Sequence, residues 1–242
     1  MSAIIVPAAV TVTALIASTL AAIAGFGGAA VLLPVLVWAF GVRDAIPILT
    51  VAQLVGNGSR VWFNRRELVL PVVGWFAIGA VPLAAAGGFL FATAPAPALR
   101  RVLGAFLLLT VVYRHTSFGR KAHVGLRGFA AIGGVFGFLS ALLGSVGPLM
   151  APFFLAYGLI KGAYIGTEAS ATVIMHVVKI SVYGGFSLFS LTSVFTAAAI
   201  GLVMVAGSYI GKHVLERVPE HVFPVLIETV LILGGLQFLL FS

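Results

Sequence analysis

The sequence contains no cysteine, and charged residues make up only 8% of its 242 positions. The lack of cysteine excludes disulfides, thiolate nucleophiles and metal sites with cysteine ligands. Soluble domains carry about a quarter charged residues, so this chain is far below their usual content. It also lacks a P-loop, an HExxH zinc motif and a recognisable serine–base dyad. These absences argue against a soluble enzyme, a zinc protease and, unless a separate subunit supplies the ATPase, an ATP-driven pump.

What the chain has instead is apolar sequence, at 61% of all residues. A soluble protein of this size could not bury so much apolar surface. The apolar residues occur in runs separated by short polar breaks, and many runs approach the roughly 20 residues with which a helix crosses a bilayer. Strand-type alternation is absent, which argues against an outer-membrane barrel. We therefore predict an all-α integral membrane protein with about eight full spans and two short broken or re-entrant helices.

The polar breaks separate ten expected helical elements. The second and seventh elements have only 12 and 13 residues, too few to span a bilayer alone. The ten ranges are 3–24, 29–40, 45–63, 69–92, 99–113, 128–143, 148–160, 163–182, 191–211 and 222–241.

The two halves of the chain resemble each other when one is shifted by 119 residues. Each half reads as a long helix, a Gly-rich break, a short Pro-containing helix, a polar helix and an apolar hairpin. If every element crosses the membrane, five elements per half place the halves in opposite orientations, and such inverted repeats are typical of secondary transporters. A short element that only dips into the membrane and returns would change this parity. We expect one transmembrane domain over 1–242, with repeat 1 about 1–113, a basic loop 114–127 and repeat 2 about 128–242. The shift aligns Gly25 with Gly144, Gly28 with Gly147, Asn57 with His176 and Arg60 with Lys179.

The formal charge of +8 comes from basic residues in short loops between apolar runs, which are topology signals rather than a nucleic-acid surface. Four of them, Arg114, Arg120, Lys121 and Arg127, lie in the central loop. The rule that positive loops stay inside predicts that 114–127 is cytoplasmic. With every element crossing, both termini then face outward.

The two Gly-rich breaks, AGFGGAA and LGSVGP, are each followed by a proline-containing helix. Glycine lets the backbone leave the helix, and a helix N-terminus inside the membrane presents free N–H groups that favour an anion. The alternative is that these glycines only permit close helix packing. Their matching positions in the two halves favour a binding site. The residues concerned are Gly25, Gly27, Gly28, Gly144, Ser145 and Gly147.

Polar residues interrupt two of the apolar runs at helical spacing, so each set shares one helix face. The first set is Gln53, Asn57 and Arg60, and the second is Glu168, Thr172, His176 and Lys179. Ionisable groups inside membrane helices usually face protein or a water-filled path. The alternatives are that Arg60 and Lys179 snorkel to the interface, that His176 is a neutral packing residue and that Glu168 lies at the cytoplasmic interface.

GFGGAAVLLP near the start and GFLSALLGSVGPLMAP at mid-chain resemble the sulfite exporter TauE/SafE family of membrane permeases. The resemblance covers almost the whole chain, including its length, its two halves, the basic central loop and both breaks. It departs from the family pattern at the second break, which reads GSVGP rather than a fuller glycine cluster. The resemblance implies transport of sulfite, sulfonates, sulfoacetate or related organic anions across a bacterial inner membrane.

Our hypothesis is a secondary transporter of a small anion by alternating access, without a cofactor, a metal or a nucleic-acid partner. Arg60 and Lys179 would supply positive charge, and Gln53, Asn57, Ser59, His176 and the glycine breaks would supply hydrogen-bond donors. Glu168, His176 and Glu228 are the candidates for proton coupling. An anion channel built from the same parts is the first alternative. An intramembrane enzyme using His176 and Glu168 is the second and less favoured one.

Overall fold

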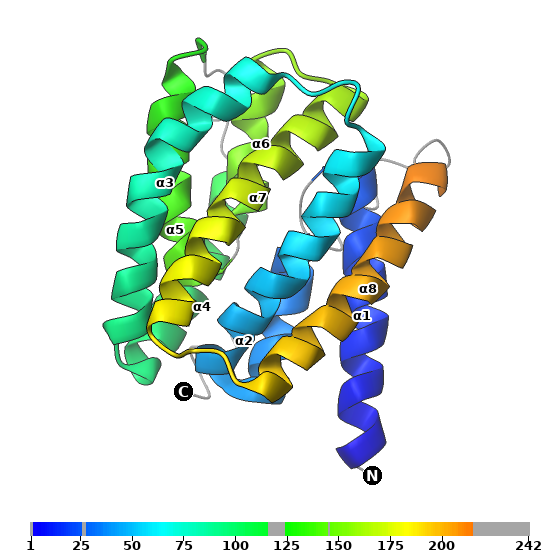
Figure 1. The fold of residues 1–242 in the computed structure, drawn as a ribbon, viewed down its shortest axis with the longest axis vertical. Helices are drawn as coiled ribbons and strands as arrows, with labels where there is room; N and C mark the ends of the chain where they lie inside the picture. The colour runs from blue at the N-terminus through cyan, green and yellow to red at the C-terminus, as the bar shows by residue number, and fades with distance from the viewer. Residues whose placement is uncertain (1, 26–27, 116–123, 145, 215–242) are drawn as a thin grey trace.

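The computed structural model describes residues 2–25, 28–115, 124–144 and 146–214. Over these ranges the secondary structure is helical, with eight α-helices (Figure 1). They are α1 (Ser2–Ala24), α2 (Gly28–Phe63), α3 (Leu70–Thr93), α4 (Ala96–His115), α5 (Gly128–Leu143), α6 (Gly147–Ala156), α7 (Lys161–Gly185) and α8 (Leu191–Val214).

The helices follow the apolar runs of the sequence closely, and α5 has the predicted bounds of 128–143. The separation of 29–40 from 45–63 is confirmed, because the range of α2 joins two helices across a kink. The chain turns within α2 at Gly41, where φ is 75° and ψ is 161°. A positive φ is readily adopted only by glycine, so a single residue makes the bend without a loop. The expected element 222–241 lies outside the described residues.

The bundle has α2 and α7 at its centre, α3 and α5 on one side, and α1 and α8 on the other (Figure 1). The second part of α2 runs antiparallel to α7, and α3 runs antiparallel to α8. Small residues let the outer pairs approach closely. A Cβ on Gly79 would lie 1.8 Å from the carbonyl oxygen of Ala130, and one on Gly207 would lie 2.0 Å from Ser18 Oγ. Close backbone approach of this kind is how helices associate where no hydrophobic driving force exists between them.

Five of the described helices are long and apolar enough to cross a membrane, namely α1, α2, α3, α7 and α8. Two more apolar helices, α5 and α6, are shorter. The short α6, with 10 residues, agrees with the expected short seventh element. Large apolar side chains such as Leu191, Phe195 and Leu202 point outward, and such a surface suits lipid. The chain is therefore a multi-pass helical membrane protein.

Candidate functional site

Two helices end at a glycine with a similar φ and the same type of hydrogen bond. Helix α1 ends at Ala24, and Gly25 follows with φ 80°. Helix α5 ends at Leu143, and Gly144 follows with φ 82°. In each case the glycine N–H donates to the carbonyl four residues earlier, at 2.8 Å and 2.9 Å respectively. This is the usual way in which a left-handed glycine ends a helix.

A basic side chain reaches the end of each of these helices. Arg60 Nη1 donates to the carbonyl oxygens of Gly25 at 2.8 Å and of Ala21 at 3.3 Å. Lys179 Nζ donates to Ser140 Oγ at 3.1 Å and lies 3.5 Å from the Ser140 carbonyl oxygen. Positive charge is favourable at a helix C-terminus, where unpaired carbonyls carry partial negative charge. Both basic residues therefore hold a helix break in place.

Arg60 also orients two amides on its own helix. Its Nη2 donates to Asn57 Oδ1, and Asn57 Nδ2 donates to Gln53 Oε1 at 3.1 Å. Because a guanidinium can only donate, Asn57 must turn its oxygen toward Arg60, and Gln53 must then turn its oxygen toward Asn57. The buried Gln53 Nε2 is left without a hydrogen-bond partner among the described residues. We call this chain of hydrogen bonds from Arg60 through Asn57 to Gln53 the amide relay. It leaves the Gln53 side-chain N–H free as a donor.

Glu168 joins α7 to α2 through Arg60. Its Oε2 lies 3.6 Å from Arg60 Nη1, and both side chains are almost fully buried. Its other oxygen accepts a hydrogen bond from Thr172 Oγ1 at 3.2 Å. This ion pair connects the first half of the sequence to the second.

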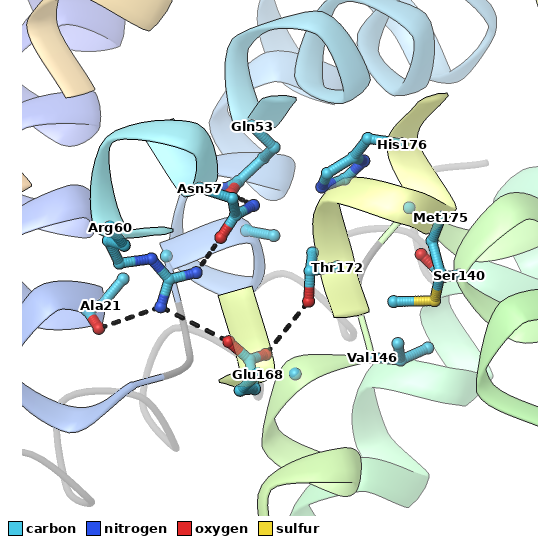
Figure 2. A pocket seen from close by; sticks show the side chains of 14 residues that line it. Ala21, Gln53, Asn57, Arg60, Ser140, Val146, Glu168, Thr172, Met175 and His176 are labelled. Atoms are coloured by element: carbon cyan, nitrogen blue, oxygen red, sulfur yellow. Dashed lines mark hydrogen bonds and ion pairs between the residues drawn. The ribbon is translucent and has the colours of Figure 1, made fainter. Parts of the chain in front are cut away.

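These groups surround a cavity of about 40 Å³. A cavity needs about 10–15 Å³ of water-accessible volume to hold one water, so this space suits a few waters or one small ion. Figure 2 shows Gln53, Asn57 and Arg60 of α2 facing Glu168, Thr172 and His176 of α7. The cavity is lined by Ala21, Gly28, Ala29, Gln53, Asn57, Arg60, Ser140, Gly144, Val146, Gly147, Glu168, Thr172, Met175 and His176.

His176 is 2% exposed, and within the described residues neither ring nitrogen has a hydrogen-bond partner. A neutral imidazole carries one donor and one acceptor, so at least one unused donor is available here. Leaving such groups buried without a partner is costly, which indicates that water or a ligand satisfies them. His176 and Gln53 are the two lining side chains with unused nitrogens.

Four pairs of lining residues are separated by the 119 positions that relate the two halves of the sequence. They are Ala21 and Ser140, Gly28 and Gly147, Gln53 and Thr172, and Asn57 and His176. The carboxylate of Glu168 breaks the pattern, because its counterpart in the first half is the buried Leu49. The cavity therefore lies where the two halves meet, and its charge is not symmetric.

Most of the residues singled out from the sequence meet here. Gly28, Gln53, Asn57, Arg60, Gly144, Gly147, Glu168 and His176 line the cavity. Three do not: Gly25 contributes its carbonyl to Arg60, Lys179 lies behind Ser140, and Ser59 bonds back to the Gly56 carbonyl. The predicted donor role of Ser59 was therefore wrong, since that hydroxyl is used within its own helix. Gly27, Ser145 and Glu228 lie outside the described residues.

The snorkelling alternative does not hold for either basic residue. Arg60 is 6% exposed and Lys179 is 0% exposed, and both bond to backbone inside the bundle. Glu168 is likewise 2% exposed and paired with Arg60. These three ionisable groups therefore face protein rather than lipid.

Two site residues had no signal strong enough to be found from the sequence. Ser140 stands four residues before Gly144, as Ala21 stands four residues before Gly25, so the repeat itself was the available clue. Tyr164 lies against Gly25, where an added Cβ would come within 2.2 Å of its ring, and its buried hydroxyl has no partner in the described ranges. A tyrosine in an apolar helix gives no such indication. Among the described residues, no cluster of three His, Asp or Glu side chains suits a metal.

A helical bundle with paired helix breaks around a buried polar cavity is typical of membrane transporters. The family comparison agrees: the model of the family described as Sulfite exporter TauE/SafE matches residues 10–238. The chain belongs to this family of membrane permeases. Comparisons with curated proteins and with solved structures gave no match.

Proposed function

We propose that this chain is a secondary transporter of small sulfur-containing or organic anions of the sulfite, sulfonate or sulfoacetate type. The observation that carries the proposal is the cavity, where two helices begin and two buried donors are unused. Helix α2 begins at Gly28 and α6 begins at Gly147, and both glycines line the space. A helix N-terminus attracts anions through its free N–H groups and its dipole. Gln53 Nε2 and the His176 ring add donors that a bound oxyanion can satisfy.

The chain's two halves, in this proposal, are inverted repeats of one domain that exchange roles during alternating access. The antiparallel courses of α3 and α8 support the inversion, as do the paired lining residues (Figure 1). A site between two inverted repeats can open to one side when one half adopts the conformation of the other. The ion pair between Arg60 and Glu168 crosses the cavity, so rearranging one half relative to the other changes the surroundings of both charges.

The proposal extends to placement in the cell: a bacterial inner membrane, with loop 114–127 cytoplasmic and both termini outside. The ends of the bundle support it. The α2–α3 connection, with Arg65 and Arg66, lies at the end opposite to the α7–α8 connection (Figure 1). The α7–α8 connection carries no Lys or Arg. Positive loops collected at one end are what the positive-inside rule requires.

The test is transport by the purified chain in liposomes. Saturable uptake of ³⁵S-sulfite that is accelerated by unlabelled sulfite on the opposite side is expected, because a carrier exchanges substrate across the membrane. Thiosulfate, methanesulfonate and acetate added as competitors then define the substrate class. Ohmic single-channel currents would instead indicate an anion channel. Chemical turnover of a membrane substrate would indicate an enzyme, and both results would overturn the proposal.

A further inference from the structure

The cation that lines the cavity already has an anionic partner. The Glu168 carboxylate lies 3.6 Å from Arg60 Nη1. The same Nη1 also donates to the carbonyls of Ala21 and Gly25, and Nη2 donates to Asn57. An anion that approaches Nη1 from the cavity therefore competes with Glu168 for the same nitrogen. Repulsion between two anions in so small a space would otherwise oppose binding.

We propose that Glu168 is the proton-binding site of this transporter, and that one anion replaces its carboxylate at Arg60 while Glu168 takes up one proton. This inference rests on the proposed function, because it specifies how that site binds its anion. The balance is simple: the ion pair opens, the incoming anion bonds to Arg60, and a proton from water neutralises the displaced carboxylate.

The physical reason is the surroundings of Glu168. Its side chain is 3% exposed, its only described hydrogen bond comes from Thr172, and Oε2 has the Arg60 ion pair but no hydrogen bond. A buried carboxylate with so little compensation is strongly unfavourable, and protonation removes its charge. A protonated carboxyl also becomes a donor. The Tyr164 hydroxyl, one helical turn earlier and without a described partner, provides an additional polar group nearby.

Other titratable groups lie on some of the elements packed around Glu168. Helix α2 presents Arg60, and α7 itself carries Lys161, Tyr164, His176, Lys179 and Tyr183. The α2–α3 connection, which bonds to Thr167 through Val69 N, carries Arg65, Arg66 and Glu67. Helices α1, α3, α5 and α6 contain no Asp, Glu, His, Lys, Arg or Tyr. Glu168 is the only carboxylate among the lining residues. The second half of the chain thus carries a proton acceptor that its Leu49 counterpart in the first half cannot be.

Linkage makes the effect reciprocal: anion binding favours the protonated state, so protonation favours anion binding. Affinity should rise as pH falls, by up to about tenfold per pH unit where one proton enters with each anion. A monovalent anion and a proton together carry no net charge. The direction of net transport is then set by the anion gradient and the pH difference rather than by the membrane potential.

The experiment measures sulfite binding by calorimetry between pH 5.5 and 8.5 for the wild type, Glu168→Gln and Glu67→Gln. Glu67 is an exposed acid in the α2–α3 connection, so it controls for the loss of one carboxylate. Sulfite itself exchanges a proton near neutral pH, so the informative quantity is the difference between proteins at each pH. We expect Glu168→Gln to bind sulfite at least about tenfold more tightly than the wild type at pH 8.5 and equally at pH 5.5. Glu67→Gln should follow the wild type.

A second measurement needs no variant. Adding sulfite to wild-type protein in weakly buffered solution should remove about one proton from the medium per site, beyond the proton exchange of sulfite alone. In liposomes, Glu168→Gln should keep sulfite exchange but lose accumulation driven by a pH difference.

The measurements distinguish failure of the proposed transport function from failure of the proposed protonation of Glu168. No saturable sulfite binding by the wild type would overturn the proposed function and this inference with it. Sulfite binding with the same pH dependence in wild type and Glu168→Gln would overturn the inference alone. Loss of the pH dependence in Glu228→Gln, with Glu168→Gln unchanged, would also overturn it, since the proton would then bind elsewhere. If Glu168→Gln does not fold, the proton uptake by the wild type decides.

Discussion

Arg60 and Lys179 make equivalent contacts in the two halves of the chain, each at the last turn of the helix that opens its half. Arg60 bonds to the carbonyl of Ala21, and Lys179 lies against that of Ser140, 119 residues further on. They differ in their neighbours, because Arg60 pairs with Glu168 while Lys179 has no acidic partner among the described residues. The two cations therefore occupy equivalent positions in the two halves, but only Arg60 has a carboxylate beside it among the described residues.

Neutralising either cation should weaken anion binding. Arg60→Gln and Lys179→Gln are both expected to reduce affinity by more than about tenfold, because removing a desolvated charge partner commonly costs about 2–5 kcal/mol. Lys179 does not line the cavity, so its effect acts through the field of a buried charge, which is poorly screened. Isothermal titration with sulfite gives the affinities, and circular dichroism checks folding.

The controls for this pair are Arg60→Lys, Lys179→Arg and Ser140→Ala. The first two keep the charge and should retain more affinity than the Gln variants. Ser140→Ala removes a hydroxyl partner of Lys179 but leaves the ammonium, so it should be milder than Lys179→Gln. Wild-type affinity and flux in both Gln variants would reduce the pair to helix-end anchors.

The two break glycines should differ in their tolerance of a methyl group. Both have a positive φ, which costs a non-glycine residue roughly 1–2 kcal/mol. A Cβ on Gly25 would also lie 2.2 Å from the Tyr164 ring, whereas one on Gly144 meets nothing nearer than 3.4 Å. Gly25→Ala should therefore lower the melting temperature and transport rate more than Gly144→Ala.

The matched control is Gly58→Ala on α2, because an added Cβ there meets nothing within 4 Å and its φ is not positive. Adding Tyr164→Ala to Gly25→Ala should recover part of the lost stability by removing the clash. Equal melting temperatures for Gly25→Ala and Gly58→Ala would show that the break geometry is not required.

Gln53→Glu tests the free donor of the amide relay. A glutamate keeps the oxygen that accepts from Asn57 Nδ2 but replaces the Nε2 donor with a second oxygen. We expect anion affinity to fall by at least about tenfold, because one donor is lost and an acceptor faces the anion. Thermal stability and sulfite binding are measured together. Gln53→Glu with unchanged sulfite affinity would exclude this residue from the anion contact.

The orientation of the chain in the membrane can be tested by cysteine labelling, because the natural chain has no cysteine. A single cysteine at position 117, in place of Ser117, should be protected from an impermeant thiol reagent added to intact cells. The loop around it holds four basic residues and is expected inside. Ser187→Cys, on the exposed α7–α8 connection, is the control and should react from outside. The reverse labelling pattern would invert the proposed orientation.

The sequence alone predicted most of the helices in the described part of the chain and many of the residues that line the cavity. Apolar runs in a membrane protein must form helices, because lipid offers no partner for free backbone groups, so the run boundaries predict the helix boundaries. The break glycines and the polar faces of α2 and α7 could be identified because they interrupt the apolar runs. Any group that departs from the apolar pattern inside a bilayer needs a partner or a function.

What only the tertiary structure decided is which groups meet. Nothing in the spacing of Arg60 and Glu168 predicts that they form an ion pair, since they lie on helices from different halves. The sequence likewise could not place Lys179 behind Ser140 or Tyr164 against Gly25. Helical periodicity specifies which residues share a face, but the facing of two helices depends on how all the others pack. That packing decides which donors stay free for a ligand and which are already used by the protein.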